Sequence, residues 1–515
     1  MKRFLLQSVA SFARPFGASR AGNVAMIYAL SLFPAIAAVG SAVDLTRALV
    51  VKMRLGEALD AAGLAVGGSL GLTQAQITLK AQQFFYANYP DAELGDVTGL
   101  SVSTSGLNGN IVTVAGSARV DTAFMKLFGI NYLDVNVNVQ VTRESKGVEI
   151  ALVLDNTGSM GQNGKLTALK NASNTLINTL WGAQATATNV RMAIVPFSQT
   201  VRVGTTAATN GGWMDTNGTS STARLNFNNN QYAFAVWPTM QNQTWQGCVE
   251  ARPNGLEELD TAPSAGTPDT RWVPYFEADG PDGNGNYSDY VPDLLAGNPT
   301  DEQRLKNSLK YVAQNNTNSQ RDCNIATVVP LTNVKSTVTN AITAMIASGN
   351  THVAIGAGWG WRVLSPTAPY TEGSSYNDPQ WTKAMVLMTD GLNTTPSNNG
   401  THKSQYTAYN FLLRNQLGTT NGPASETEQD NRTATVCARA KTAGIRVYTI
   451  LLEETSSRAQ NLMQGCASDD ANRDNSTPKC NSDSSKLCYL SPSSSQLQAV
   501  FQAIANDLSN LRLSQ

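Results

Sequence analysis

The sequence has very little histidine, the residue that most often serves as a general base or a metal ligand. It contains two histidines, His352 and His402, which argues against a His-rich metal centre and leaves few candidates for a general base. Lysine plus arginine (37) nearly balances aspartate plus glutamate (38), so no net charge favours binding to nucleic acid. Charged residues are scarce, whereas Asn, Ser, Thr and Gly are abundant, a balance that is common in exported, loop-rich proteins.

The cysteines include no CxxC pair. Their even number and their long spacings favour disulfides in an oxidising compartment over a zinc site. A bond between the first two would staple the loop-rich region that separates them. The sequence does not fix the connectivity, and the pairs that we consider are Cys248–Cys323, Cys437–Cys466 and Cys480–Cys488.

No acidic residue precedes Asp44, and Val24 to Val43 contains no charge of either sign. Twenty uncharged, mostly apolar residues are long enough to cross a bilayer as a helix. The basic segment 1–23 predicts a cytoplasmic N-terminus, with everything after Asp44 exported. A cleaved signal peptide is the alternative, since Ala35 and Ala37 form an A-x-A pattern. We favour a retained inner-membrane anchor at 24–43, because the apolar run exceeds a usual signal sequence and the helical pattern continues beyond it.

Residues 44–146 are predicted to form a membrane-proximal helix and a small α+β module. A second helical pattern runs from about Thr73 to Tyr89, and residues 97–143 then alternate like strands, with turns between them. Apolar residues share one face of the first helix, namely Ala48, Val51, Leu55, Leu59, Ala62 and Val66.

Residues 147–515 are predicted to form an α/β domain with a doubly wound, mostly parallel sheet. Buried, apolar strands alternate with amphipathic helices, which favours right-handed crossovers. Residues 205–322 lack this periodicity and are rich in Asn, Gly, Thr, Pro and Trp, so they read as a large loop insertion. The predicted strands are Val148–Asp155, Val190–Phe197, Ala384–Met388 and Ile445–Leu452.

Oxygen side chains follow two of these strands. Asp155, Thr157 and Ser159 follow the first, and Asp390 follows the third, at the strand ends where open α/β sheets place their sites. Carboxylates and hydroxyls suit a hard divalent cation, Mg²⁺ first, with Mn²⁺ or Ca²⁺ as alternatives. The other interpretation is that both aspartates only cap turns. A nucleotide-binding P-loop is excluded, because the glycine spacing is wrong and Leu166 replaces the required Ser or Thr.

Three segments resemble the loops of a von Willebrand factor A domain with its metal-ion-dependent adhesion site. They are DNTGSM at 155–160, GNT at 349–351 and TDG at 389–391. The resemblance implies a bound magnesium ion that takes an acidic residue of a partner into its open position. Thr157 stands where the family usually has Ser and keeps the hydroxyl. The ligands that the resemblance implies are Asp155, Thr157, Ser159, Thr351 and Asp390.

The ends of the chain and one internal segment resemble TadG-type proteins of bacterial tight-adherence (Flp) pilus systems. The segments are GNVAMIYALSLFPAIAAVGSAVDLTRALVVKMRLGEALDAAGLA, TAFMKLFGINYLDVNVNVQVTR and LQAVFQAIANDLSNLRLSQ. This resemblance implies a non-enzymatic, single-pass inner-membrane protein with a large periplasmic portion that serves pilus assembly. Its expected partners are pilus or envelope proteins that present an Asp or Glu. The alternative is a surface-exposed adhesin that contacts external ligands through the same domain and its insertion. Metal-dependent hydrolysis lacks a convincing general base and a second metal site.

Overall fold

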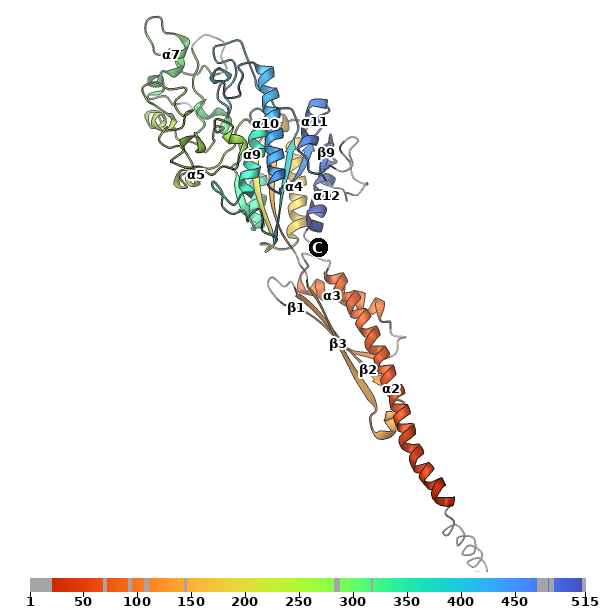
Figure 1. Cartoon of the computed structure of the whole chain (residues 1–515). Coiled ribbons are helices and arrows are strands. Elements are labelled where there is room, and N and C mark those ends of the chain that lie inside the picture. Colours follow the sequence, from red (N-terminus) through yellow and green to blue (C-terminus); the bar gives the residue numbers. More distant parts are fainter. Residues whose placement is uncertain are drawn as a thin grey trace, which may run out of the picture. The chain divides into compact units, whose positions relative to one another are not determined.

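The structure is a computed structural model with two compact units, Met1–Glu144 and Ser145–Gln515 (Figure 1). It describes residues 21–67, 72–90, 95–105, 111–142, 146–281, 288–315, 318–469, 480 and 486–511. Most of the predicted basic segment 1–23 therefore lies outside the described residues. Each unit is described by itself.

The first unit is a long helix packed on an antiparallel sheet of three strands, in the order β1-β2-β3 (Figure 1). The predicted apolar face of the helix is confirmed, because Val51, Leu55 and Leu59 are fully buried against the sheet and a second helix. That second helix begins at a capping box formed by Thr73 and Gln76. The elements are α2 (Ala21–Gly67), α3 (Gln74–Asn88), β1 (Asp96–Ser105), β2 (Ile111–Asp121), the 3₁₀ helix η2 (Met125–Phe128) and β3 (Tyr132–Thr142).

The first half of α2 is apolar on all sides, and its large side chains from Val24 to Ile36 are mostly exposed. Within the described residues, α2 is the one helix that is long and apolar enough to cross a membrane. A helix that is apolar all round needs an apolar environment, whereas the core-facing helix of a soluble domain has one apolar stripe. The large exposed side chains between 24 and 36 are Val24, Met26, Ile27, Tyr28, Leu30, Leu32, Phe33 and Ile36.

The second unit contains a sheet of six strands in the order β6-β5-β4-β7-β8-β9. Four of the five pairings are parallel, and only the edge strand β6 runs antiparallel to its neighbour β5. The predicted doubly wound, mostly parallel sheet is confirmed, whereas β6 and β9 were not predicted. The strands are β4 (Gly147–Asp155), β5 (Val190–Phe197), β6 (Val329–Thr332), β7 (Trp381–Thr389), β8 (Arg446–Leu451) and β9 (Cys488–Leu490).

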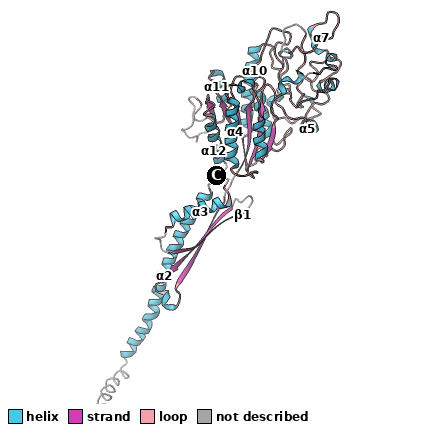
Figure 2. Cartoon of the chain, turned by 180° about the vertical axis from the view of Figure 1, so that it is seen from behind, coloured by secondary structure: helices cyan, strands magenta, loops and turns pink. Residues whose placement is uncertain are grey.

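Helices cover both faces of this sheet (Figure 2). Alternate residues of β4 face opposite layers, since Ile150 and Leu152 pack with α4, α8 and α12, while Ala151 and Val153 pack with α9 and α10. Both faces are therefore apolar, which explains the continuous hydrophobic run of this strand. The helices are α4 (Lys165–Trp181), α8 (Lys335–Ala344), α9 (Val353–Leu364), α10 (Gly422–Thr442), α11 (Ser457–Cys466) and α12 (Leu497–Leu511).

The long segment between β5 and β6 folds onto the α9 side of the sheet. Its four tryptophans belong to the same core as α9, and the Trp272 and Trp359 rings lie 4.9 Å apart. All three disulfides that we considered are present, and Cys248–Cys323 closes this segment. Its short helices are α5 (Thr206–Asn210), α6 (Ala233–Val236), η4 (Trp237–Thr239), η5 (Leu256–Glu258), η6 (Pro268–Thr270), α7 (Asp301–Lys306), η7 (Ser308–Tyr311) and η8 (Asn318–Cys323).

Candidate metal centre

Asp155 and Asp390 meet because β4 and β7 are parallel neighbours that end together. The two strands pair in register from Gly147 with Trp381 to Leu154 with Met388. Asp155 is the last residue of β4, and Asp390 follows the last residue of β7. Both are buried, at 0% and 5% exposure. Two carboxylates thus lie at the carboxyl end of the central strands, at the edge where open α/β sheets bind ligands.

Hydrogen bonds link these carboxylates through hydroxyl groups. The Thr157 N–H donates to Asp155 Oδ1 at 2.7 Å, and Thr157 Oγ1 lies 3.0 Å from Ser159 Oγ. Ser159 Oγ then donates to Asp390 Oδ1 at 2.6 Å. From the β7 side, Thr389 Oγ1 donates to Asp155 Oδ2 at 2.7 Å. The structure therefore brings four of the five predicted ligands into one hydrogen-bonded group of oxygens.

The fifth predicted ligand, Thr351, lies in a loop that packs on the Asp155–Ser159 turn. The Gly158 N–H donates to Gly349 O at 3.0 Å. Thr351 is buried, and its backbone joins the segment after β7, since its N–H donates to Thr394 Oγ1 at 3.1 Å. Gly349 has a φ of +81°, and a Cβ there would lie 3.1 Å from Ser198 Oγ, so this close approach of loops requires glycine.

Lys165 is a member of the site that the sequence analysis missed. It is the first residue of α4, and its Nζ donates to Asp390 Oδ2 at 2.9 Å. The side chain is only 13% exposed. The sequence signal for this contact is a lysine directly after the Gly-rich turn.

Burial controls the electrostatics of the site. Desolvation, followed by repulsion from Asp390, raises the pKa of Asp155 to about 6, although the bonds from Thr157 and Thr389 act to lower it. His352 is fully buried beside the site, and desolvation lowers its pKa to about 3. Its ring stacks on Tyr409 with the centroids 5.7 Å apart, so it is a neutral packing residue.

The geometry of these oxygens fits a hard divalent cation. Adjacent ligands around an octahedral ion with Mg–O bonds of about 2.0–2.1 Å lie about 2.9 Å apart. The Thr157–Ser159 and Ser159–Asp390 oxygen pairs, at 3.0 and 2.6 Å, lie close to that separation. No group of three or more His, Cys, Asp or Glu that could hold a metal occurs in the part of the chain that the structure describes. A cation at this site would therefore depend on the hydroxyl oxygens as well as on the two carboxylates.

The sheet order, its single antiparallel edge strand and the three loops at its carboxyl edge define a von Willebrand factor A-type fold. The predicted fold is confirmed. Residues 22–69 match a family model described as "Putative Flp pilus-assembly TadE/G-like". The predicted resemblance to that family is confirmed over those residues.

Several solved structures are similar to this chain at low identity. The pilus adhesin SpaC from Lactobacillus rhamnosus GG is 12% identical with a TM-score of 0.33, and the match covers 81% of this chain and 35% of SpaC, about a third of its length. The von Willebrand factor domain of the type V pili tip protein Mfa5 from Porphyromonas gingivalis is 11% identical with a TM-score of 0.33. The match covers 72% of this chain and 97% of the Mfa5 chain. Proximal thread matrix protein 1 from the mussel byssus, with a zinc-occupied MIDAS motif, is 11% identical with a TM-score of 0.29. The match covers 71% of this chain and 48% of that protein. No curated protein matches the chain.

Proposed function

We propose that this chain is a non-enzymatic, membrane-anchored factor in Flp pilus assembly. We propose further that its A-type domain binds an acidic residue of a partner protein through a divalent cation, with Mg²⁺ as the expected ion and Mn²⁺ or Ca²⁺ as alternatives. The observation that carries this proposal is the connected group of oxygens from Asp155 through Thr157 and Ser159 to Asp390. The pilus-assembly match at residues 22–69 gives the cellular context.

The predicted ligands divide into two chemical kinds. Asp155 and Asp390 supply negative charge, whereas Thr157, Ser159 and Thr351 supply neutral oxygens. A bound cation would supply an electrophilic position for a carboxylate of the partner. Because only two carboxylates face the cation, and Lys165 already offsets part of the charge of Asp390, the site retains an attraction for a third carboxylate.

The remaining features support an anchor in the inner membrane with the bulk of the chain in the periplasm. Residues 24–43 of α2 would cross the bilayer with the N-terminus in the cytoplasm, and 44–146 would separate the membrane from the domain at 147–515. The disulfides Cys248–Cys323, Cys437–Cys466 and Cys480–Cys488 fit an oxidising compartment.

Partner capture tests this proposal. Purified wild type, Asp155→Ala and the control Asp469→Asn would each be mixed with a cell-envelope extract in the presence of Mg²⁺ or of chelator, and bound proteins would be crosslinked afterwards. Asp469 suits the control because its side chain is 74% exposed on the same unit. We expect capture by wild type and by the control with Mg²⁺ alone, and none by Asp155→Ala. Equal capture in all conditions would contradict the proposal. Labelling of the intact chain from outside the cell would instead favour the surface adhesin.

A further inference from the structure

The turn between β2 and β3, residues 122–131, presents an unusual set of side chains to its surroundings. Phe124, Leu127, Phe128 and Ile130 are 38%, 72%, 46% and 43% exposed. Lys126 is the single charged residue of this turn. Soluble surfaces rarely expose so many large apolar side chains together, so such a patch indicates an apolar partner.

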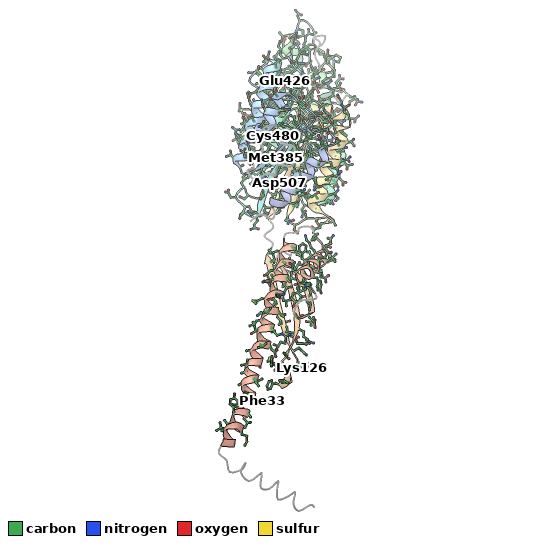
Figure 3. All side chains as sticks on the ribbon, turned by 90° about the vertical axis from the view of Figure 1, so that its right-hand side faces the viewer. Phe33, Lys126, Met385, Glu426, Cys480 and Asp507 are labelled. Carbon is green, nitrogen blue, oxygen red and sulfur yellow. A yellow bond between two sulfur atoms is a disulfide. The ribbon has the colours of Figure 1, made fainter. Side chains whose placement is uncertain are left out.

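This β2–β3 turn lies against the apolar half of α2. The Phe128 and Phe33 rings contact each other edge to face, with centroids 5.7 Å apart. Phe124 covers Gly40, where an added Cβ would lie 2.6 Å from the phenylalanine side chain. Figure 3 shows Phe33 and Lys126 at the same end of the first unit.

If residues 24–43 cross the bilayer as predicted, the contact with Phe33 sets the depth of the turn. Phe33 precedes Val43, the predicted end of the span, by ten residues, or about 15 Å along a helix. The hydrocarbon core of a bilayer is about 30 Å thick. The tip of the turn therefore lies beside residues that are predicted to cross the membrane, and not beyond them.

Most backbone N–H groups of the turn are hydrogen-bonded within the first unit. The buried Asp44 carboxylate accepts the N–H groups of Ala123, Phe124 and Met125 at 2.7–2.9 Å. The N–H groups of Thr122, Leu127, Gly129 and Ile130 donate to carbonyl oxygens of the same turn. In lipid, unpaired backbone groups cost several kcal/mol each, so these internal bonds lower the cost of moving the turn into lipid.

Polar and aromatic side chains follow directly behind the apolar tip. The Arg119 guanidinium lies 3.7 Å from the centroid of the Tyr132 ring and pairs with Asp134 at 3.0 Å. Tyrosine and arginine are suited to the headgroup region, and the long side chain of Lys126 can reach the same region from the tip.

We propose that the β2–β3 turn inserts into the lipid bilayer beside α2, in the leaflet where α2 leaves the membrane. This inference rests on the proposed membrane anchor. Lipid acyl chains are the occupant that we favour over a second protein helix, because the exposed apolar residues of α2 lie all round the helix and continue onto the turn, whereas a helix partner would cover one stripe.

A fluorescent depth probe tests this insertion. The six native cysteines are paired, so a cysteine introduced at Leu127 would provide a unique thiol for an environment-sensitive dye. The full chain would be placed in vesicles of phosphatidylethanolamine and phosphatidylglycerol, with or without brominated acyl chains. Matched probes go at Leu30 on α2, which is 72% exposed, and at Ser103, an exposed residue of β1. Circular dichroism checks that each variant is folded.

We expect bromolipids to quench the probe at Leu127 about as strongly as the probe at Leu30, with no loss of fluorescence at Ser103. Quenching at Leu30 with a water-exposed probe at Leu127 would overturn the insertion and leave the anchor standing. A water-exposed probe at both positions would overturn the anchor as well. An apolar environment at Leu127 that bromolipids do not quench, but that a quencher-labelled second copy does, would assign the turn to a protein contact and also overturn the insertion.

Discussion

Lys165 Nζ lies 2.9 Å from Asp390 Oδ2, so one candidate metal ligand is already paired with a cation of the chain itself. A buried carboxylate needs a counter-charge, and here a lysine supplies it next to the place where a divalent ion would bind. A divalent ion bound there would compete with Lys165 for the same carboxylate, so the affinity for metal would depend on α4 as well as on the loops.

Lys165→Met should therefore strengthen binding of Mn²⁺, a spectroscopic substitute for Mg²⁺, by about tenfold, equivalent to about 1.4 kcal/mol. Titration followed by electron paramagnetic resonance measures this. The metal-free variant should melt below wild type, because Asp390 then lacks its partner, and Mn²⁺ should restore most of the difference. Lys170→Met is the control, since Lys170 bonds only to Thr343 O among the contacts described for its Nζ. An unchanged or weaker affinity in Lys165→Met would contradict the competition.

The hydroxyl of residue 157 should matter more than its methyl group. Thr157 is buried and uses its Oγ1 at 3.0 Å from Ser159 Oγ. Thr157→Ser should bind Mn²⁺ as wild type does, whereas Thr157→Ala should lose about tenfold or more in affinity, as is usual when a group around a metal is removed. Equal affinities for the Ser and Ala variants would remove Thr157 from the ligand set.

Glu250 predicts a pH-dependent stability that is separate from the metal site. Burial raises the pKa of this carboxyl to about 8, from 4.5, although Tyr406 and Asn410 bond to it and act to lower it. The folded state thus binds a proton that the unfolded state releases, and stability falls as pH rises from about 4.5 to about 8.

Glu250→Gln cannot ionise, so its free energy of unfolding relative to wild type should rise between about pH 5 and about pH 8.5 by at least about 1.4 kcal/mol, the equivalent of one pKa unit. Urea unfolding at both pH values measures the difference. The exposed Glu372→Gln provides the control. A difference that is independent of pH would contradict the raised pKa.

The Cys248–Cys323 disulfide should hold the segment between β5 and β6 in place. Its cysteines are 75 residues apart, and the segment has no long helix or strand of its own among its described residues. Replacing both cysteines by serine should cost about 2–4 kcal/mol and expose the segment to trypsin. The Cys437–Cys466 disulfide joins α10 to α11 instead. Replacing these two cysteines by serine should leave the segment between β5 and β6 resistant to trypsin. Equal proteolysis of both variants would show that this disulfide has no local role.

The sequence predicts the central strands well because they are buried on both faces. Long apolar runs define β4, β5, β7 and β8 to within a few residues. The edge strands β6 and β9 have four and three residues, too few for any periodicity, and β6 contains Pro330. The segment between β5 and β6 escapes prediction for a different reason, since distant contacts such as that of Trp272 with Trp359 determine its fold.

The candidate site shows the same division. Its predicted oxygens follow strand ends directly, so local sequence places Asp155 and Asp390 at one edge of the sheet. The role of Lys165 is not predictable from local sequence, because its partner Asp390 is 225 residues away. The packing of the β2–β3 turn is not predictable either, because Asp44, which accepts its backbone N–H groups, is 79–81 residues away in the sequence. The local sequence shows only a turn.

Two glycines of α2 provide a matched test of how the β2–β3 turn is seated. A Cβ at Gly40 would lie 2.6 Å from Cβ and Cγ of Phe124, whereas a Cβ at Gly56 would lie 4.0 Å from its nearest neighbour, Val137 Cγ1. Replacing glycine by alanine inside a helix normally stabilises it by about 1 kcal/mol. Gly56→Ala should therefore raise the melting temperature of the first unit. Gly40→Ala should lower it and speed hydrogen exchange at Ala123 to Ile130, because Phe124 must move and the amides bonded to Asp44 move with it. Similar stabilisation by both substitutions would show that Phe124 does not seat the turn on α2.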